Sequence, residues 1–251
     1  MDIENNESKE RILNVSIKLF SEKGFDATRV NEIAEEAGVN KALIYYYFKS
    51  KEEILDHLID LLFSNVTSMA MDFVHVNIVR MLKDGRLDIK PDRLHFIDEE
   101  ALKYFLQQSG IYIETLTDYV LEHRDIIRII LIESLKNGKH HSTLFRLMDL
   151  LREKDDNPLY KTIRDADDDF NFSDDMIMYK FFFSFMAYIC FAAYYEDYKS
   201  SSGLSDQEIR STFLRSVRRV TFPYITENEI FMPQKIMEIF KGTTPGQVWD
   251  I

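Results

Sequence analysis

Residues 28–53 read TRVNEIAEEAGVNKALIYYYFKSKEE. This stretch predicts two short helices joined by a tight turn, followed at once by a third helix. The apolar residues of the first helix recur at i, i+3, i+4 and i+7 and are Val30, Ile33, Ala34 and Ala37. Thr28 stands where it can cap this helix, and Gly38 follows where a left-handed residue would end it. The pattern predicts a helix-turn-helix, whose second helix enters the major groove of DNA.

The second helix of the pair is expected to begin near Asn40. Ile44 and Phe48 lie four residues apart and should point inward. The opposite side carries Ala42, Tyr45 and Tyr46, with Lys41 at its N-terminal edge. A helix laid in a major groove needs such small, aromatic and hydrogen-bonding groups, because the groove offers base acceptors and thymine methyl groups. This outward face is therefore the predicted DNA-reading surface.

Ser50 and Glu53 form a Ser-x-x-Glu capping box, which predicts that a further helix begins immediately. Lys51 lies in the first turn of that helix. A cation is unfavourable there unless an anion lies nearby, because the helix N-terminus is itself positive. We expect a DNA phosphate to be that anion.

The sequence IAEEAGVNKALIYYYFKSKEEIL at 33–55 resembles the signature of the TetR family of bacterial transcriptional regulators, and SIKLFSEKGF at 16–25 extends the resemblance. The match runs from about Arg11 to Leu58. Tyr47 departs from the family, which more often has His at this position, and Asn31 stands where many members have Arg. The resemblance implies a three-helix DNA-binding head on an all-helical body that dimerises and usually holds a small effector. The residues expected to contact double-stranded DNA are Thr28, Arg29, Asn40, Lys41, Ala42, Leu43, Tyr45, Tyr46, Tyr47 and Lys51.

We therefore expect an all-α protein with a helix-turn-helix domain at 1–51 and a helical effector-binding and dimerisation domain at 52–251. The net charge of −12 has the wrong sign for a general nucleic-acid binder. Residues 1–51 carry eight lysines and arginines against nine acidic residues, whereas residues 52–251 carry 23 against 34. The negative charge thus belongs mainly to the body, which should weaken non-specific DNA binding.

The body reads as helix throughout, with no sustained period-two alternation. We expect long connections at 84–92 and 154–175. The expected helices are Glu52 to about Lys83, Asp98 to His123 with a possible break at Ser109 and Gly110, Asp125 to Lys136, Ser142 to Glu153, and Met176 to Tyr198.

The longest apolar stretch runs from Phe181 to Tyr195 without a charge. It is too short for a membrane span, which needs ~20 apolar residues, so we expect no membrane association and a buried helix at a subunit interface. Cys190 should be a buried thiol. A second helix begins with the Ser205 and Glu208 capping box and ends before Pro223. By resemblance, the two helices form the four-helix dimer interface, with an ordinary hairpin in the monomer core as the alternative. The expected dimer contacts are Phe185, Ile189, Ile209, Phe213, Val217 and Val220.

A small-molecule effector, apolar or aromatic, is expected inside the body, where aromatic and methionine side chains are abundant. The predicted lining residues are Tyr104, Phe105, Tyr112, Tyr119, Phe182 and Met186. Glu100, Glu114 or Glu133 inside the pocket would favour a cationic ligand, but a solvated face or a salt bridge explains each equally well.

No metal or cofactor is expected. Asp165, Asp167 and Asp169 imitate a calcium loop, but Phe170 replaces the required Gly and Met176 the closing Glu. His140 and His141 have no third spaced ligand.

No P-loop, GxSxG, HExxH or GxGxxG motif is present, so no enzyme is expected. The N-terminus has neither a basic region nor an apolar one, so the protein is expected in the cytoplasm. The prediction is a ligand-responsive regulator, a repressor that binds a palindromic operator as a homodimer. The alternative is a DNA-bound adaptor whose body binds a protein partner.

Overall fold

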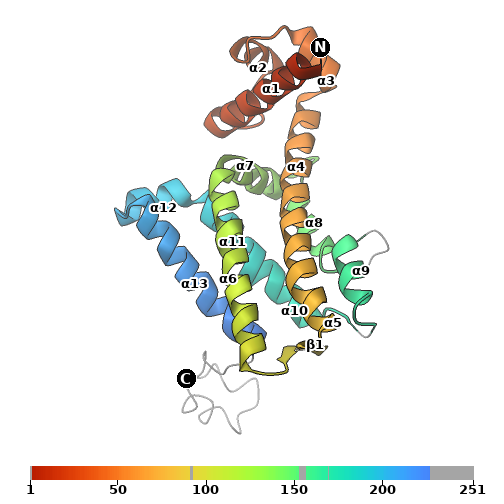
Figure 1. Cartoon of the computed structure of the whole chain (residues 1–251). Helices are drawn as coiled ribbons and strands as arrows, with labels where there is room; N and C mark the ends of the chain where they lie inside the picture. Colours follow the sequence, from red (N-terminus) through yellow and green to blue (C-terminus); the bar gives the residue numbers. More distant parts are fainter. Residues whose placement is uncertain (1, 91–92, 153–156, 169, 227–251) are drawn as a thin grey trace.

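The computed structural model describes residues 2–90, 93–152, 157–168 and 170–226. A small helical head lies at one end of the molecule and a larger helical body at the other (Figure 1). The predicted all-α class is confirmed. The division into domains at residue 51 stays a prediction, because one buried apolar cluster contains residues of both the head and the body.

The head consists of α1 (Asp2–Lys23), α2 (Val30–Glu36) and α3 (Lys41–Tyr47). The turn between α2 and α3 forms as the sequence predicts. Gly38 is left-handed, with φ of 65°. Its N–H donates to the Glu35 carbonyl, and the N–H of Val39 donates to the Ala34 carbonyl. These two bonds satisfy the last carbonyls of α2 and fix the angle at which α3 leaves.

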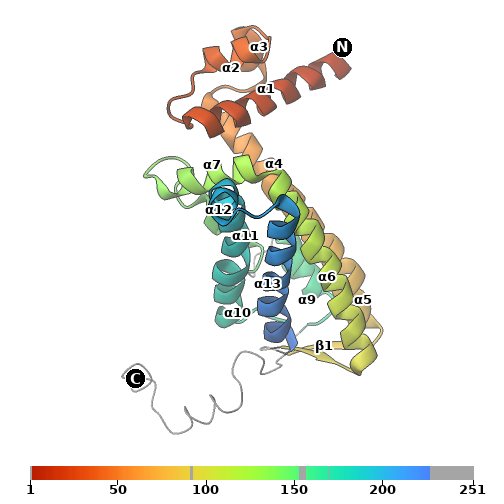
Figure 2. The same cartoon turned by 90° about the vertical axis from the view of Figure 1, so that its left-hand side faces the viewer.

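A nearly continuous helical rod joins the head to the far end of the body. It comprises α4 (Lys51–Phe73), the π-helical turn η1 (Val74–Val79) and α5 (Arg80–Lys83). The Ser50 hydroxyl accepts from the Glu53 N–H at 3.2 Å and caps α4. Two views at right angles place the head at one end of this rod and β1 near the other (Figures 1 and 2).

The expected connection at 84–92 is wrong in part, because it begins an antiparallel hairpin of β1 (Leu87–Lys90) and β2 (Arg93–Phe96). Leu87 is buried, and Ile89, Leu94 and Phe96 pack against the second apolar cluster. Each strand alternates for only four residues, which is too short a signal to predict a strand by period alone.

The body continues with α6 (Glu99–Glu122), α7 (Arg124–Leu135), η2 (Thr143–Phe145), α8 (Arg146–Asp149) and α9 (Pro158–Arg164). The break expected at Ser109 and Gly110 does not occur, since α6 is unbroken. The helix expected at 142–153 is shorter than predicted. The acidic connection contains α9, which Asn157 caps by accepting from the N–H groups of Leu159 and Tyr160.

The C-terminal part contains α10 (Asp174–Tyr179), the π-helical turn η3 (Lys180–Phe185), α11 (Met186–Ala193), α12 (Tyr195–Ser202) and α13 (Asp206–Thr226). Both arms of the Ser205 and Glu208 capping box form, which confirms that prediction. The sequence predicts that this last helix ends before Pro223, but α13 continues to Thr226. Gly203 is left-handed and ends α12.

Candidate nucleic-acid interface and effector pocket

Helix α3 divides into a buried and an exposed face, as its sequence predicts. Ile44 and Phe48 are 1% and 3% exposed, whereas Tyr45 and Tyr46 are 46% and 71% exposed. The Asn40 side chain caps the helix by accepting from the Leu43 N–H at 2.8 Å. The head therefore exposes two tyrosine side chains that are not part of its apolar core.

The other expected DNA contacts surround this face. Arg29, Asn40, Lys41 and Ala42 are exposed, and Leu43 and Tyr47 are half-buried. The Lys41 ammonium lies 5.7 Å from the centroid of the Tyr45 ring, so a cation and two phenols share one surface. Their contact with DNA stays a prediction.

Thr28 neither caps α2 nor reaches the surface. It is 1% exposed, and its hydroxyl donates to the carbonyls of Leu19 and Gly24 at 3.2 and 2.9 Å. The N-cap position is instead occupied by Arg29, whose N–H donates to the Glu32 carboxylate. Thr28 joins α1 to the loop before α2, so the prediction of a DNA contact from its side chain is wrong.

Lys51 also points into the protein. Its ammonium donates to the carbonyls of Phe25, Asp26 and Thr28 at 2.6, 3.2 and 3.0 Å, and it lies 4.4 Å from the centroid of the Phe25 ring. Three carbonyls thus use all three donors of the ammonium. The predicted phosphate contact is corrected, because the loop between α1 and α2 supplies the negative partners that the sequence pattern required.

Replacing Lys51 with methionine should lower the free energy of unfolding by about 1–3 kcal/mol, because the three loop carbonyls would lose a charged donor. Denaturant unfolding followed by circular dichroism measures this change. Lys49→Met, at an exposed position two residues earlier, is the matched control and should leave stability unchanged. Equal stability of the two variants, with DNA binding lost only in Lys51→Met, would restore the phosphate contact.

The loop between α1 and α2 also contacts the body. The Lys136 ammonium donates to the Asp26 carboxylate at 2.8 Å, and the rings of Phe25 and His140 lie edge to face with centroids 5.9 Å apart. The hydrogen bond from Lys136 lowers the pKa of the Asp26 carboxyl, and Asp26 and Glu133 raise the pKa of Lys136. Helix α4 is thus not the only link between head and body.

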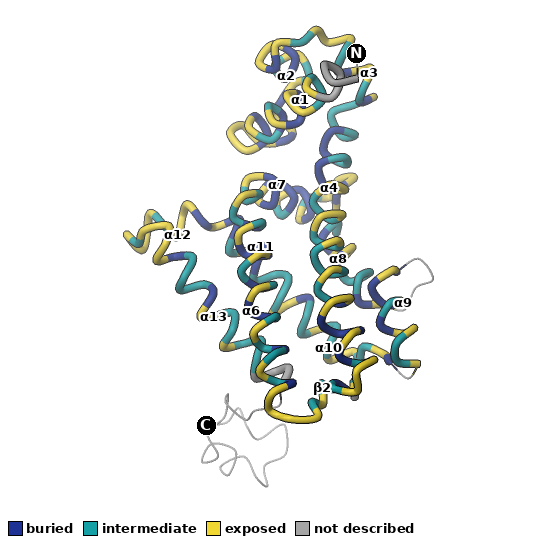
Figure 3. Tube along the Cα trace, in the orientation of Figure 1, coloured by how far each residue is buried: buried dark blue, intermediate teal, exposed yellow. Residues whose placement is uncertain are grey.

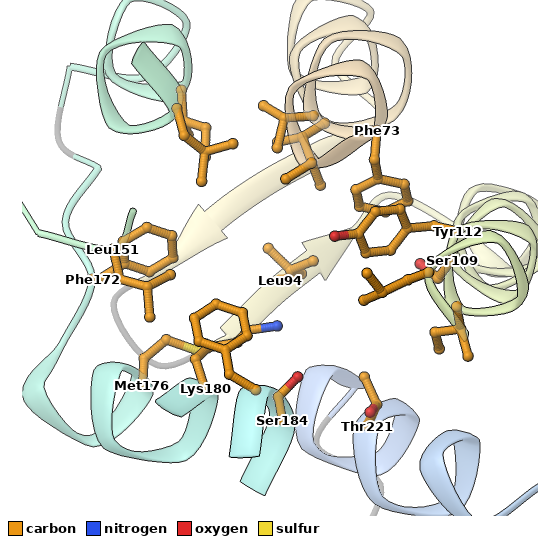
Figure 4. Close-up of a pocket in the computed structure, with 18 of the residues that line it drawn as sticks. Phe73, Leu94, Ser109, Tyr112, Leu151, Phe172, Met176, Lys180, Ser184 and Thr221 are labelled. Atoms are coloured by element: carbon orange, nitrogen blue, oxygen red, sulfur yellow. The ribbon is translucent and has the colours of Figure 1, made fainter. Parts of the chain in front are cut away.

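The body contains a predominantly apolar, partly open cavity of about 240 Å³, with lining residues from α4, η1, the hairpin, α6, α9, α10, η3, α11 and α13. Its lining includes Ala70 and Phe73 from α4 and Leu94 from the hairpin (Figure 4). Phe105 and Tyr112, both predicted to line a pocket, lie in this wall.

A second cavity of about 70 Å³ lies closer to the head and is lined by Tyr112 and Tyr119 among others. The other expected pocket residues line neither cavity. Tyr104 lies beneath the Arg86 guanidinium, Met186 packs in the apolar cluster that joins head and body, and Phe182 is exposed. They line neither of these two cavities, and their contact with an effector stays a prediction.

The polar groups in the wall of the larger cavity differ from those expected. Glu100, Glu114 and Glu133 do not line it. Lys180 does, and burial lowers the pKa of its ammonium. The only signal for Lys180 in the sequence is its place directly before the apolar run that begins at Phe181.

The apolar segment of α10 to α12 is not buried on all sides. Within it, Asp174–Ala193 has a mean hydropathy of 1.6 and is 28% buried. By length and composition alone, these 20 residues could cross a membrane. Cys190, expected to be buried, is exposed. Helix α12 lies mainly at the surface, in yellow in Figure 3. The exposed large apolar side chains of this segment are Met178, Phe182, Phe183, Tyr194 and Tyr198.

The residues expected at the dimer interface contact other parts of the same chain. Ile189 and Ile209 are buried within the chain, and Phe213 stacks on Phe191 at 3.7 Å between ring centroids. Phe185 and Val217 pack against the apolar cluster that joins head and body, and Val220 is half-buried. The periodic stripe on α13 thus contacts the chain's own body, and the role of its half-buried members in a dimer stays a prediction.

Comparison with known proteins agrees with the geometry of the head. Residues 12–58 match the bacterial regulatory proteins of the tetR family. The head of this chain belongs to the TetR family.

Two relatives of this chain are helix-turn-helix transcriptional regulators. YerO of Bacillus subtilis, itself uncharacterized, is 34% identical over 130 residues, which cover 52% of this chain and 37% of YerO. IcaR of Staphylococcus aureus, a negative regulator of the biofilm operon icaADBC, is 36% identical over 110 residues, which cover 41% and 54% of the two chains. The matches thus span about a third to a half of these relatives.

A solved structure from Clostridium perfringens, described as a candidate fatty acid metabolism regulator, has a TM-score of 0.51 at 15% identity and covers 82% of this chain and 96% of that one. At this identity the likeness supports the fold alone.

Proposed function

We propose that this chain is a ligand-responsive transcriptional repressor that binds a palindromic operator as a homodimer in the cytoplasm. The observation that carries the proposal is the exposed face of α3, with Lys41, Tyr45 and Tyr46 at the end of the molecule. Its relatives are transcriptional regulators, and IcaR is a negative one.

The α3 surface has the chemistry for groove binding. Lys41 offers a cation to phosphates or to guanine acceptors, and the phenols of Tyr45 and Tyr46 offer hydrogen-bond donors. The acidic residues of the head partly pair within it: Glu36 with Lys18 and Glu32 with Lys23. The α3 surface therefore keeps its positive charge locally, although the chain as a whole is acidic.

A ligand in the larger cavity could bias the head by two routes. Helix α4 carries Phe73 at the cavity and Lys51 at the head. Helix α7 packs against both α11 and α1, and Lys136 just beyond its end holds Asp26. A ligand that prefers one arrangement of these helices shifts the spacing of two heads away from successive major grooves, about 34–36 Å apart.

The homodimer would form through the exposed apolar side chains of α10 to α12. Met178 and Phe182 lie four residues apart, as do Tyr194 and Tyr198, so the members of each pair are neighbours on the helix surface. A second copy would cover this surface, because contiguous exposed apolar groups mark interaction sites.

The same surface favours a second candidate function, a DNA-bound adaptor that holds a different protein through its body. The predominantly apolar cavity supports the small-molecule regulator instead. Light scattering of the purified protein separates the two: a dimer supports the regulator, whereas a monomer with this face uncovered supports the adaptor.

Lys41→Ala, Tyr45→Phe and Tyr46→Ala should each weaken specific DNA binding by about 1–3 kcal/mol, because each removes one phosphate or base contact. The measurement is the affinity, at one fixed salt concentration, for a duplex that the wild-type protein selects from a random pool. Stability should stay within about 0.5 kcal/mol of the wild type because these side chains are exposed.

Lys83→Ala is the matched control, at an exposed lysine of α5 far from the head (Figure 1). Unchanged affinity in all three α3 variants would refute the proposed interface. A loss of affinity in Lys83→Ala as large as that in Lys41→Ala would mean that the measurement reports net charge and not the α3 surface.

A further inference from the structure

Lys180 ends in the larger cavity of the body, where its amine points among apolar side chains (Figure 4). It is the first residue of η3, the π-helical turn between α10 and α11. Among the described residues of the lining, Lys180 alone carries a formal charge at neutral pH. No hydrogen bond or ion pair joins its ammonium to another described residue. Within the described part of the chain, the cavity therefore holds one cation without a counter-ion in a predominantly apolar wall.

This placement differs from that of an ordinary surface lysine. A surface lysine lays its methylene stem along apolar residues and leaves its ammonium in bulk water. Removing an ammonium from water without a partner is unfavourable, and burial accordingly lowers the pKa of Lys180. A bound anion would supply the missing partner.

The same wall contains the neutral polar residues Ser109, Tyr112, Asn171, Ser184 and Thr221. Ser109 is 5% exposed, and its hydroxyl has no hydrogen-bond partner among the described residues. The Tyr112 hydroxyl points into the cavity (Figure 4), and burial raises its pKa to about 12, so it remains a neutral donor. Both groups can donate a hydrogen bond to an anionic oxygen.

We propose that the cavity binds a small amphiphile with one carboxylate, held by the Lys180 ammonium, and an apolar body packed among Phe73, Leu94 and Phe105. This inference rests on the proposed function, since it names the chemical class of the effector. One lysine balances a single negative charge, whereas a phosphate dianion would leave a second charge uncompensated in an apolar site. The volume of about 240 Å³ lies just below the ~300–1,000 Å³ usual for ligand pockets. A short fatty acid or an aromatic monocarboxylate has the required size.

The test compares octanoate with 1-octanol, which share a chain length and differ in charge. Calorimetry and thermal shift on the full chain should show octanoate binding at least tenfold more tightly than 1-octanol. Lys180→Met should weaken octanoate at least tenfold while leaving 1-octanol unchanged or tighter, and Lys180→Arg should keep the preference for octanoate. Lys199→Met, at a lysine outside the cavity, should bind both compounds as the wild type does.

Retained 1-octanol binding shows that Lys180→Met is folded. Equal octanoate affinity in the wild type and Lys180→Met would overturn the inference. If both compounds bind the wild type equally and both lower its affinity for the selected DNA, the effector pocket stands and the carboxylate class fails. If neither compound binds, this inference fails, while the DNA affinities of the α3 variants decide the proposed function separately.

Discussion

Replacing Ile44 with aspartate should unfold the head. Ile44 is 1% exposed and belongs to the apolar cluster that also contains Phe20, Phe48 and Ile54. Truncating a buried isoleucine alone costs about 2–5 kcal/mol, and an unpaired carboxylate in the same place adds its desolvation. We therefore expect the free energy of unfolding to fall by more than about 3 kcal/mol, together with complete loss of specific DNA binding.

Tyr46→Asp is the matched control for Ile44→Asp, because it places the same charge on the same helix at a side chain that is 71% exposed. It should leave the melting temperature nearly unchanged while also abolishing DNA binding, since a carboxylate would face phosphates. Denaturant unfolding of both variants separates the two effects. Equal stability of Ile44→Asp and Tyr46→Asp would contradict the orientation of α3.

Replacing Phe182 with glutamate should convert a dimer into monomers. Phe182 is 52% exposed on η3, and in the proposed homodimer a glutamate there would be desolvated against its own copy. A monomer can bind only one half of a palindrome, so affinity for the selected DNA should fall by roughly 100-fold or more. Light scattering measures the assembly, and the head should keep its stability.

Ile97→Glu provides the comparison for Phe182→Glu, because Ile97 is 69% exposed between β2 and α6 and is not part of the segment from α10 to α12. It should remain dimeric and bind DNA as the wild type does. A wild-type protein that is monomeric at micromolar concentration would remove the homodimer and the palindrome together.

Phe213→Glu should act differently from Phe182→Glu if the proposed homodimer forms through α10 to α12. Phe213 lies edge-on to Tyr188 at 5.3 Å and stacks on Phe191 within the same chain. The substitution should destabilise the body instead of separating intact subunits, which distinguishes the two faces of the C-terminal helices.

Most of the head can be predicted from the sequence alone. The end of α2 and the starts of α3 and α4 depend on neighbours within a few residues: Gly38 on the carbonyls of α2, Asn40 on the Leu43 N–H, and Ser50 on Glu53. The alternation of buried and exposed faces on α3 follows from 100° per residue. Such local rules needed no knowledge of the rest of the chain.

The partners of several charged and apolar side chains could not be predicted, because those partners lie far away in the sequence. Lys51 looked free to bind phosphate, but its acceptors lie 23 to 26 residues earlier in the chain. The apolar stripe of α13 fits a dimer as well as a core in the sequence, and only the fold shows that its Phe213 contacts Tyr188 and Phe191 of the same chain. Lys180 marked the edge of an apolar run in the sequence and lines a cavity in the fold. Periodicity specifies that a helix has an apolar face, whereas the partner of that face depends on contacts between distant segments.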